Sequence, residues 1–264
     1  MEVHHHAHTD SHRGKKKWTH YFWEFMMLFL AVFCGFLAEN MRERVVENHR
    51  AYDYATNLYQ DIQLDRDELK RGINQTYFMI DAIDSLVAIY KRIPPAGPVP
   101  GSFYYYARFA TSTFRVDWSK STIDQLIQSG NLRYFRSKML VEDISFYYYM
   151  QGIVAEQNRM DMTHRDKIID YRNRIFQSRY YEYFVPMDPR WVLKGKKYPG
   201  VDSLLKLRLP LQENSAELMD EFINHVLDRK ARLLPIVERY YPIADTTASD
   251  IGEGLVHLYH LKIK

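Results

Sequence analysis

Cysteine, glycine and proline are all scarce in this chain of 264 residues. The single cysteine excludes a disulfide framework and any zinc site built from cysteines. The 11 glycines and 10 prolines exclude collagen-like and low-complexity classes. A formal net charge of +3, from 36 basic and 33 acidic residues, is too small to indicate a nucleic-acid-binding protein. Intrinsic disorder is excluded as well, because 46% of the residues are hydrophobic.

The motifs of common catalytic and nucleotide-binding sites are missing too. The sequence contains no HExxH, GxGxxG, GxSxG, P-loop or EF-hand pattern. Its one cysteine, Cys34, lies within an apolar run where a thiolate would be costly, so we expect it to be a small packing residue. We therefore expect neither enzymatic activity nor a cofactor.

The strongest positive signal is an apolar run near the N-terminus. From Tyr21 to Ala38 the chain reads YFWEFMMLFLAVFCGFLA, 18 residues with one charge, Glu24. As a helix this run would be about 27 Å long, close to the roughly 30 Å of a bilayer's hydrocarbon core. Trp18 and the basic residues before it suit a membrane interface. We predict a transmembrane helix over residues 18–40, preceded by a flexible tail over residues 1–17.

Two alternatives to a membrane anchor were weighed on the sequence. The uninterrupted apolar stretch, Phe25 to Ala38, has only 14 residues and could by itself be a buried core helix. A cleaved signal peptide is disfavoured, because a cut after Ala38 would place Phe36 where a small residue is needed. A lipoprotein cut before Cys34 is disfavoured for the same reason by Phe33. We therefore predict a retained signal anchor.

The charges beside the run predict its orientation. Four basic residues lie between Arg13 and Lys17, against Arg42, Arg44 and Arg50 on the other side. The short basic tail favours a cytoplasmic N-terminus, with residues 41–264 exported.

The string KKKWTHYFWEFMMLFLAVFCGFLAEN, from Lys15 to Asn40, resembles the signature of an uncharacterised family. These are single-pass membrane proteins of Gram-negative bacteria that carry a domain of unknown function. The resemblance is close over about residues 1–70, where a His-rich start, the anchor and a charged helix follow one another, and Ser121 to Phe135 resembles a recurrent family segment. It implies an inner-membrane anchor and a helical domain in the cell envelope. The family has no assigned activity, so no catalytic residue is carried over.

Helical periodicity dominates the rest of the chain. Between Met41 and Ile93 no proline occurs, and apolar residues recur at three- and four-residue steps, which predicts one amphipathic helix of about 50 residues. Its length suggests a coiled coil or a long bundle helix. The loop from Pro94 to Gly101 should end it.

Capping signals place the later helices. Ser119 or Ser121 should cap a short helix that stops at Gly130, and a long helix should run from Asn131 to about Tyr183. A last long helix should start at Ser215.

Pro235 should kink this last helix. The end of the chain, Leu255 to Ile263, fits a short strand or a final helical turn equally well. Together the patterns predict a mainly α fold, in which one transmembrane helix precedes an antiparallel bundle of long helices over residues 41–264.

Glu24 is the one charge inside the apolar run, and such residues are functional candidates by default. His20 lies four residues earlier, on the same helical face. A proton-coupled membrane subunit would need such an acid. The simpler interpretation, which we favour, is that Glu24 lies at headgroup depth and pairs with Lys17 or His20.

Three further groups were singled out as site candidates. The small residues Ala31, Cys34, Gly35 and Ala38 are spaced to let two transmembrane helices pack closely, which suggests a homo-oligomer, although small residues are also common in single spans. Two tyrosine clusters could form a ligand pocket or partner surface, or could simply lie at the edge of the core: Tyr104, Tyr105, Tyr106, Tyr147, Tyr148 and Tyr149. A histidine-rich tail could gather around a metal ion, or be a plain solvated tail: His4, His5, His6, His8 and His12.

The sequence thus predicts a membrane-anchored structural protein, a scaffold or accessory subunit of an envelope assembly. Its expected partners are the lipid bilayer, a second copy of itself and another membrane protein, but no nucleic acid. The alternatives are a ligand-sensing bundle that signals through a partner, and a proton-coupled subunit that uses Glu24.

Overall fold

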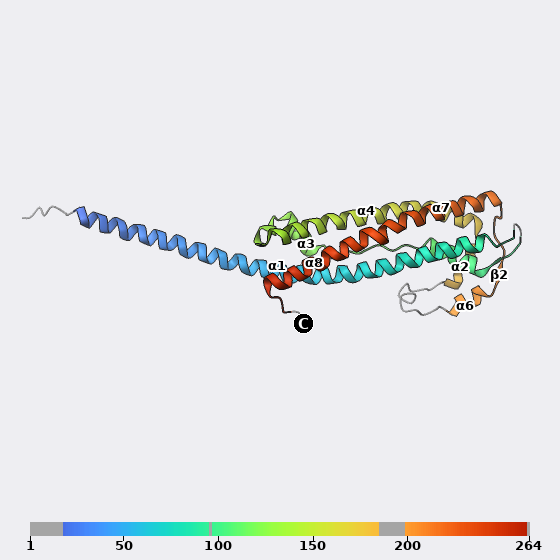
Figure 1. Ribbon diagram of the computed structural model, residues 1–264, viewed down its shortest axis with the longest axis horizontal. Coiled ribbons are helices and arrows are strands. Elements are labelled where there is room, and N and C mark those ends of the chain that lie inside the picture. Colours follow the sequence, from blue (N-terminus) through green and yellow to red (C-terminus); the bar gives the residue numbers. More distant parts are fainter. Residues whose placement is uncertain (1–17, 95–96, 185–198, 263–264) are drawn as a thin grey trace, which may run out of the picture. The chain divides into compact units, whose positions relative to one another are not determined.

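The computed structural model describes residues 18–94, 97–184 and 199–262 (Figure 1). Helices make up 83% of these residues and strands 2%, which confirms the prediction of a mainly α fold. The chain divides into two compact units, one up to Ala51 and one from Tyr52 onward. Helix α1, Trp18–Tyr90, contributes residues to both units.

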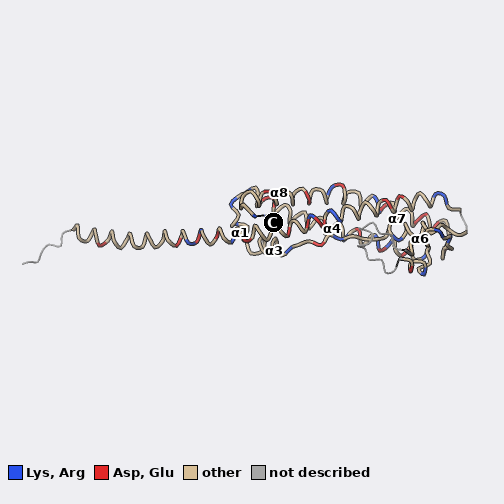
Figure 2. The backbone as a smooth tube through the Cα atoms, turned by 90° about the horizontal axis from the view of Figure 1, so that it is seen from below, with Lys and Arg blue, Asp and Glu red and all other residues tan. Residues whose placement is uncertain are grey.

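The described part of the first unit begins with the apolar start of α1, and a charged stretch follows from Glu39. Its most apolar 18-residue window has a mean hydropathy of 1.9, and none of the window is buried within the protein. Side chains such as Leu28 and Val32 are 71% and 70% exposed. Figure 2 shows this stretch almost without charge, whereas acids and bases alternate along the second unit. By length and composition, this helix is able to cross a membrane.

In the second unit, α1 buries a stripe whose members alternate at four- and three-residue steps. This seven-residue repeat turns one face of a helix toward its neighbours, as in a coiled coil. Most of the buried residues are aliphatic, but an acid, a glycine and a threonine occupy three positions of the repeat: Ala55, Leu58, Ile62, Asp65, Leu69, Gly72, Thr76, Met79, Ile83 and Leu86.

Three further helices complete the main bundle: α4 (Lys138–Ile175), α7 (Ala216–Pro235) and α8 (Tyr241–Tyr259). Figure 1 shows α4 running alongside α7. A larger apolar core joins α1, α4 and α7 with the short helix α2 (Gly101–Ala110), and includes Leu86, Phe103, Ile168 and Phe222. A smaller core joins α1, α4 and α8 with α3 (Ser121–Gln128), and includes Leu58, Ile123, Ile144 and Ile251.

Small elements surround α2. Strand β1 (Val99–Pro100) pairs antiparallel with β2 (Arg208–Leu209), with Val99 opposite Leu209. Helix α6 (Pro199–Leu205) lies so close to Gly101 that a Cβ there would be 1.8 Å from the carbonyl oxygen of Leu204. None of these pairings was predicted, because elements of two to seven residues carry too little periodicity to be recognised in a sequence.

Two predicted boundaries were wrong. Neither Ser119 nor Ser121 caps α3, whose N-cap position is Lys120. The expected single helix from Asn131 to Tyr183 is three elements: the 3₁₀ segment η1 (Asn131–Tyr134), α4, and the 3₁₀ segment η2 (Ser178–Phe184). The cause of the later start is Ser137, whose hydroxyl accepts a hydrogen bond from the Leu140 N–H at 3.3 Å and so caps α4.

Other boundaries were confirmed. Gly130 adopts a left-handed backbone with φ of 68° directly after α3. Ser215 caps α7 by accepting the Leu218 N–H at 3.2 Å. At Pro235 the regular α-helix gives way to η3 (Ile236–Tyr240), a π-helical turn, because proline supplies no N–H for the normal ladder. The end of the chain is helical as far as Tyr259 and not a strand.

Candidate functional site

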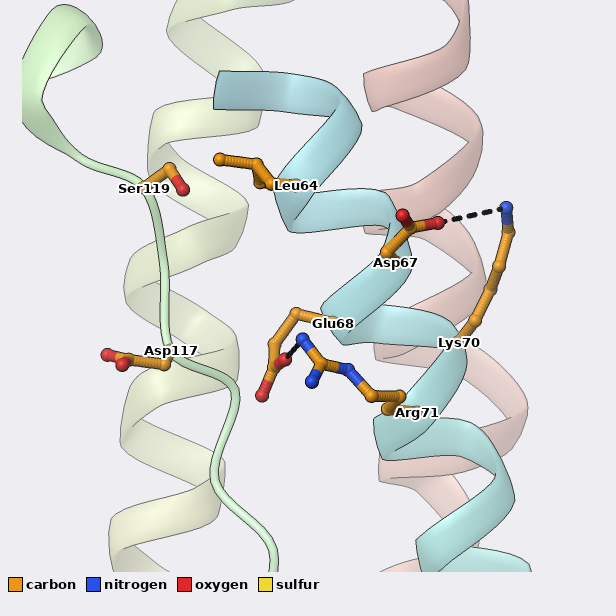
Figure 3. Close-up of a pocket in the computed structure, with 7 residues that line it drawn as sticks. All are labelled: Leu64, Asp67, Glu68, Lys70, Arg71, Asp117 and Ser119. Atoms are coloured by element: carbon orange, nitrogen blue, oxygen red, sulfur yellow. Dashed lines mark ion pairs between the residues drawn. The ribbon is translucent and has the colours of Figure 1, made fainter. Parts of the chain in front are cut away.

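A charged groove of about 600 Å³ lies on the second unit, between α1 and the segment that leads into α3 (Figure 3). Helix α1 supplies five of its lining residues and the segment supplies two: Leu64, Asp67, Glu68, Lys70, Arg71, Asp117 and Ser119. In Figure 3, Glu68 and Arg71 lie on the side of α1 that faces the segment, and the Asp67–Lys70 pair lies on the other side.

Most charges of the groove are already paired along the helix. Lys70 Nζ lies 3.7 Å from Asp67 Oδ1, and Arg71 forms an ion pair with Glu68. Both pairs join residues three apart, where helical side chains naturally meet. The exposed Asp67–Lys70 pair contributes little to stability. The groove holds three acids and two bases, so it is a polar surface without a large excess of either sign.

Beneath this groove, Asp65 is a buried carboxylate with only 1% exposure. Its Oδ1 accepts the backbone N–H of Ser119 at 2.6 Å, and its Oδ2 accepts the Tyr147 hydroxyl at 2.8 Å and the Gln151 amide at 3.0 Å. Asp65 therefore connects three elements that are far apart in sequence: α1, the segment before α3, and α4.

Burial raises the pKa of Asp65 from its ordinary 3.8 to about 6, because a charged carboxylate is poorly solvated there. The three hydrogen bonds act in the opposite direction and lower the pKa, and the nearby Asp61 raises it further. Asp65 thus has a pKa about two units above that of an ordinary carboxylate.

Asp61, one turn before Asp65 on α1, also accepts hydrogen bonds from this part of the chain. Its Oδ2 accepts the Thr122 N–H at 3.2 Å and the Ser121 hydroxyl at 3.3 Å. A carboxylate from α1 therefore accepts one of the free N–H groups in the first turn of α3, in the role that a capping serine would otherwise play.

Two polar atoms beside Asp65 are buried and lack a hydrogen-bond partner within the described ranges: Trp118 Nε1 and Gln151 Oε1. The Trp118 ring lies edge-on to Tyr147, with centroids 6.1 Å apart. Because unpaired buried polar atoms are rare in folded proteins, the surroundings of Asp65 are incompletely satisfied while the carboxylate is ionised.

The structure brings His20 and Glu24 together, as their spacing predicted. His20 Nε2 lies 3.2 Å from Glu24 Oε1, and the two side chains are 53% and 57% exposed. The small residues Ala31, Cys34, Gly35 and Ala38 are all exposed on α1. A second chain is needed to test the packing role predicted for them.

The tyrosine clusters have mixed environments. Tyr104 is fully buried, donates to the Pro210 carbonyl at 2.6 Å and accepts the Gln177 N–H at 3.1 Å. Tyr147 is buried in the smaller core, beside Asp65, whereas Tyr149 is 60% exposed. The other three are partly exposed: Tyr105, Tyr106 and Tyr148.

The candidate metal tail lies outside the described residues: His4, His5, His6, His8 and His12. Within residues 18–94, 97–184 and 199–262, no group of three or more His, Cys, Asp or Glu side chains is placed to hold a metal ion.

Comparison with known proteins assigns the chain to no family. No family model, no curated protein and no solved structure matches the chain. The functional interpretation therefore depends on the chemistry of the molecule itself.

Sequence reasoning missed the two charged residues that the bundle buries most deeply, Asp65 and Arg229. The signal was present in the apolar stripes. The step from Ile62 to Leu69 and the step from Val226 to Leu233 each span seven residues, and a charged residue fills each gap at the core-facing position.

Proposed function

We propose that this chain is a non-catalytic, single-pass scaffold or accessory subunit of the inner membrane, with an antiparallel helical bundle on the periplasmic side. The observation that carries the proposal is the start of α1, where an 18-residue apolar window of mean hydropathy 1.9 is left entirely uncovered by the protein. Exposed apolar surface on this scale is costly in water and favourable in lipid.

The character of the bundle supports an interaction role. Two of its buried or partly buried acids, Asp61 and Asp65, hold the segment before α3 against α1. The groove above them is polar and internally paired. The same helix that carries the apolar window also carries these acids. Helix α1 is therefore both the proposed membrane anchor and a core helix of the bundle.

Membrane insertion is tested by alkaline carbonate extraction. The wild-type chain should stay in the membrane pellet. The double variant Leu30→Arg/Phe33→Arg should leave it, because each arginine at the centre of a span costs about 2.5–3.5 kcal/mol. Leu64→Arg, at a 60% exposed position of the bundle, is the matched control and should stay in the pellet. A double variant that remains in the pellet would rule out the anchor.

Topology is tested with the chain's single cysteine. Cys34→Ser removes it, and Met139→Cys then places a thiol at a position of the bundle that is 71% exposed. A membrane-impermeant maleimide should label this variant in cells with a permeabilised outer membrane but an intact inner membrane. Labelling only after lysis of the inner membrane would reverse the proposed orientation.

The native mass in mild detergent tests the accessory role. A complex larger than a homo-oligomer is expected. A ligand-sensing bundle is the second candidate, favoured by the groove above the titratable Asp65. A clean monomer or homo-oligomer would count for the sensor and against the accessory subunit.

A further inference from the structure

Four arginines gather around the C-terminal end of α2. Arg229 donates to the Ala110 carbonyl at 2.6 Å and to the Ser112 carbonyl at 2.8 Å. Arg165 donates to the Thr111 carbonyl at 2.8 Å, and Arg172 donates to the hydroxyl of the same threonine at 2.5 Å. Arg108 belongs to the last turn of α2 itself.

The carboxylates in this cluster do not balance its positive charge. Asp161 holds Arg229 through two bonds, of 2.9 and 2.7 Å. Asp166 pairs with Arg165 at 2.9 Å, from a side chain that is 69% exposed. Within residues 97–184 and the other described ranges, no carboxylate pairs with Arg108 or Arg172, which leaves two guanidinium charges in excess.

Arg172 is the most unusual member of the cluster, because it is a cation with only 9% exposure. The groups that it contacts by hydrogen bond or ring stacking are neutral: the Thr111 hydroxyl, the Asn173 side-chain carbonyl at 3.1 Å, and the ring of Tyr181, whose centroid is 5.3 Å from the guanidinium carbon. Its Nε is buried and has no hydrogen-bond partner in the described structure. Burial, together with the charges of Arg108 and Arg165, lowers the pKa of Arg172.

Capping of α2 explains only part of this arrangement. The end of a helix presents free carbonyl groups and a partial negative charge, which suits the bonds from Arg229 and Arg165. Arg172 bonds to none of those carbonyls, so the helix end does not account for its burial. A buried charge normally has a counter-charge, and the described chain supplies none here.

We propose that Arg108, Arg165 and Arg172 form a binding site for a phosphate-type oxyanion. Guanidinium groups match the oxygens of such an anion in pairs of parallel hydrogen bonds. Arg172, with its unsatisfied Nε, is the deep end of the site. Arg165, whose side chain is 21% exposed, and the partly exposed Arg108 give solvent access. The anion is either free phosphate or the phosphate ester of a headgroup, and the site stands independently of the proposed membrane anchor.

Calorimetric titration of the full-length protein in non-ionic detergent tests the site, at constant ionic strength set with sodium chloride. Inorganic phosphate and glycerol phosphate are the two probes. Binding of both indicates a site for free phosphate, and binding of glycerol phosphate alone indicates a headgroup site. Arg172→Gln should weaken binding about tenfold or more, since a hydrogen bond to a charged group contributes about 1.5–3 kcal/mol and each 1.4 kcal/mol is tenfold.

Arg159→Gln is the matched control, because Arg159 lies on the same helix, is 68% exposed and pairs with Glu156. It should bind as the wild type does. If Arg172→Gln loses its helical circular dichroism, Arg165→Gln and Arg108→Gln are titrated in its place. Each should lose about tenfold or more in affinity for the anion. The proposal is overturned if the wild type binds neither probe, or if Arg159→Gln weakens binding as much as the cluster variants do.

Discussion

Replacing Asp65 by asparagine tests the reasoning about the buried site most directly. The carboxylate accepts three hydrogen bonds at 1% exposure, and its pKa is raised by burial to about 6. Asparagine has nearly the same shape and carries no charge at any pH. Its oxygen can accept the Ser119 N–H, and its amide can donate to Gln151 Oε1, which has no partner among the described residues.

The sign of the effect follows from proton binding. The folded state holds the Asp65 proton more tightly than the unfolded chain, whose pKa is near the ordinary 3.8. The stabilisation is therefore complete below about pH 4 and is lost as the pH rises toward 6 and beyond. A difference of about two pKa units corresponds to about 3 kcal/mol. For a domain of this size, that is a shift in Tm of about 6–12 °C.

The assay is thermal unfolding of the full chain in mild detergent, between pH 4 and pH 7.5, followed by circular dichroism. Asp65→Asn should gain about 6–12 °C in Tm relative to the wild type as the pH rises across this range. Asp67→Asn is the matched control, since Asp67 lies on the same helix but its side chain is 73% exposed. Its Tm should run parallel to that of the wild type.

Parallel curves for Asp65→Asn and the wild type would refute the argument, because they would mean that Asp65 titrates alike in the folded and unfolded states. A drop in Tm at every pH would show that the amide cannot replace the carboxylate as an acceptor. Those two results separate an error about the charge from an error about the hydrogen bonds.

Two further predictions concern packing. Arg229→Met leaves Asp161 at 6% exposure without its partner, so chemical unfolding should show a loss of about 3–5 kcal/mol, and Arg229→Met/Asp161→Leu should recover much of it; a loss below 1 kcal/mol would contradict the buried pair. Gly101→Ala should cost about 1–3 kcal/mol, because its methyl group would clash with the Leu204 carbonyl. Gly152→Ala, in open space on α4, is its control and should stabilise the protein by up to about 1 kcal/mol; equal effects in both variants would refute the clash.

Local signals were read correctly from the sequence where the interaction itself is local. Ser215 caps α7 through an N–H only three residues away, and Gly130 ends α3 by its own backbone conformation. The start of α3 was read wrongly, because the Thr122 N–H in its first turn bonds to Asp61, 61 residues earlier in the chain. A capping partner that distant leaves no trace in the neighbouring residues.

The surroundings of Asp65 also combine a feature that is local in the sequence with contacts that only the folded chain makes. The apolar stripe of α1 was predicted, but Asp65, which fills a seven-residue gap in that stripe, was missed. Its partners, Tyr147 and Gln151, lie on α4, and only the folded chain brings them within hydrogen-bond distance. The gap shows that a charge lies on the apolar face of the helix, but neither that this charge is buried nor which groups satisfy it.

The sequence by itself determined the mainly helical fold and the apolar start of α1, because helix formation and hydropathy depend on neighbours within a few residues. Tertiary structure decided which charges are buried, since burial depends on what packs against a side chain. It placed Asp65 among three donors and left Arg172 without a carboxylate partner among the described residues. The pKa of Asp65 and the excess charge beside α2 are properties of that packing, and no stretch of sequence contains them.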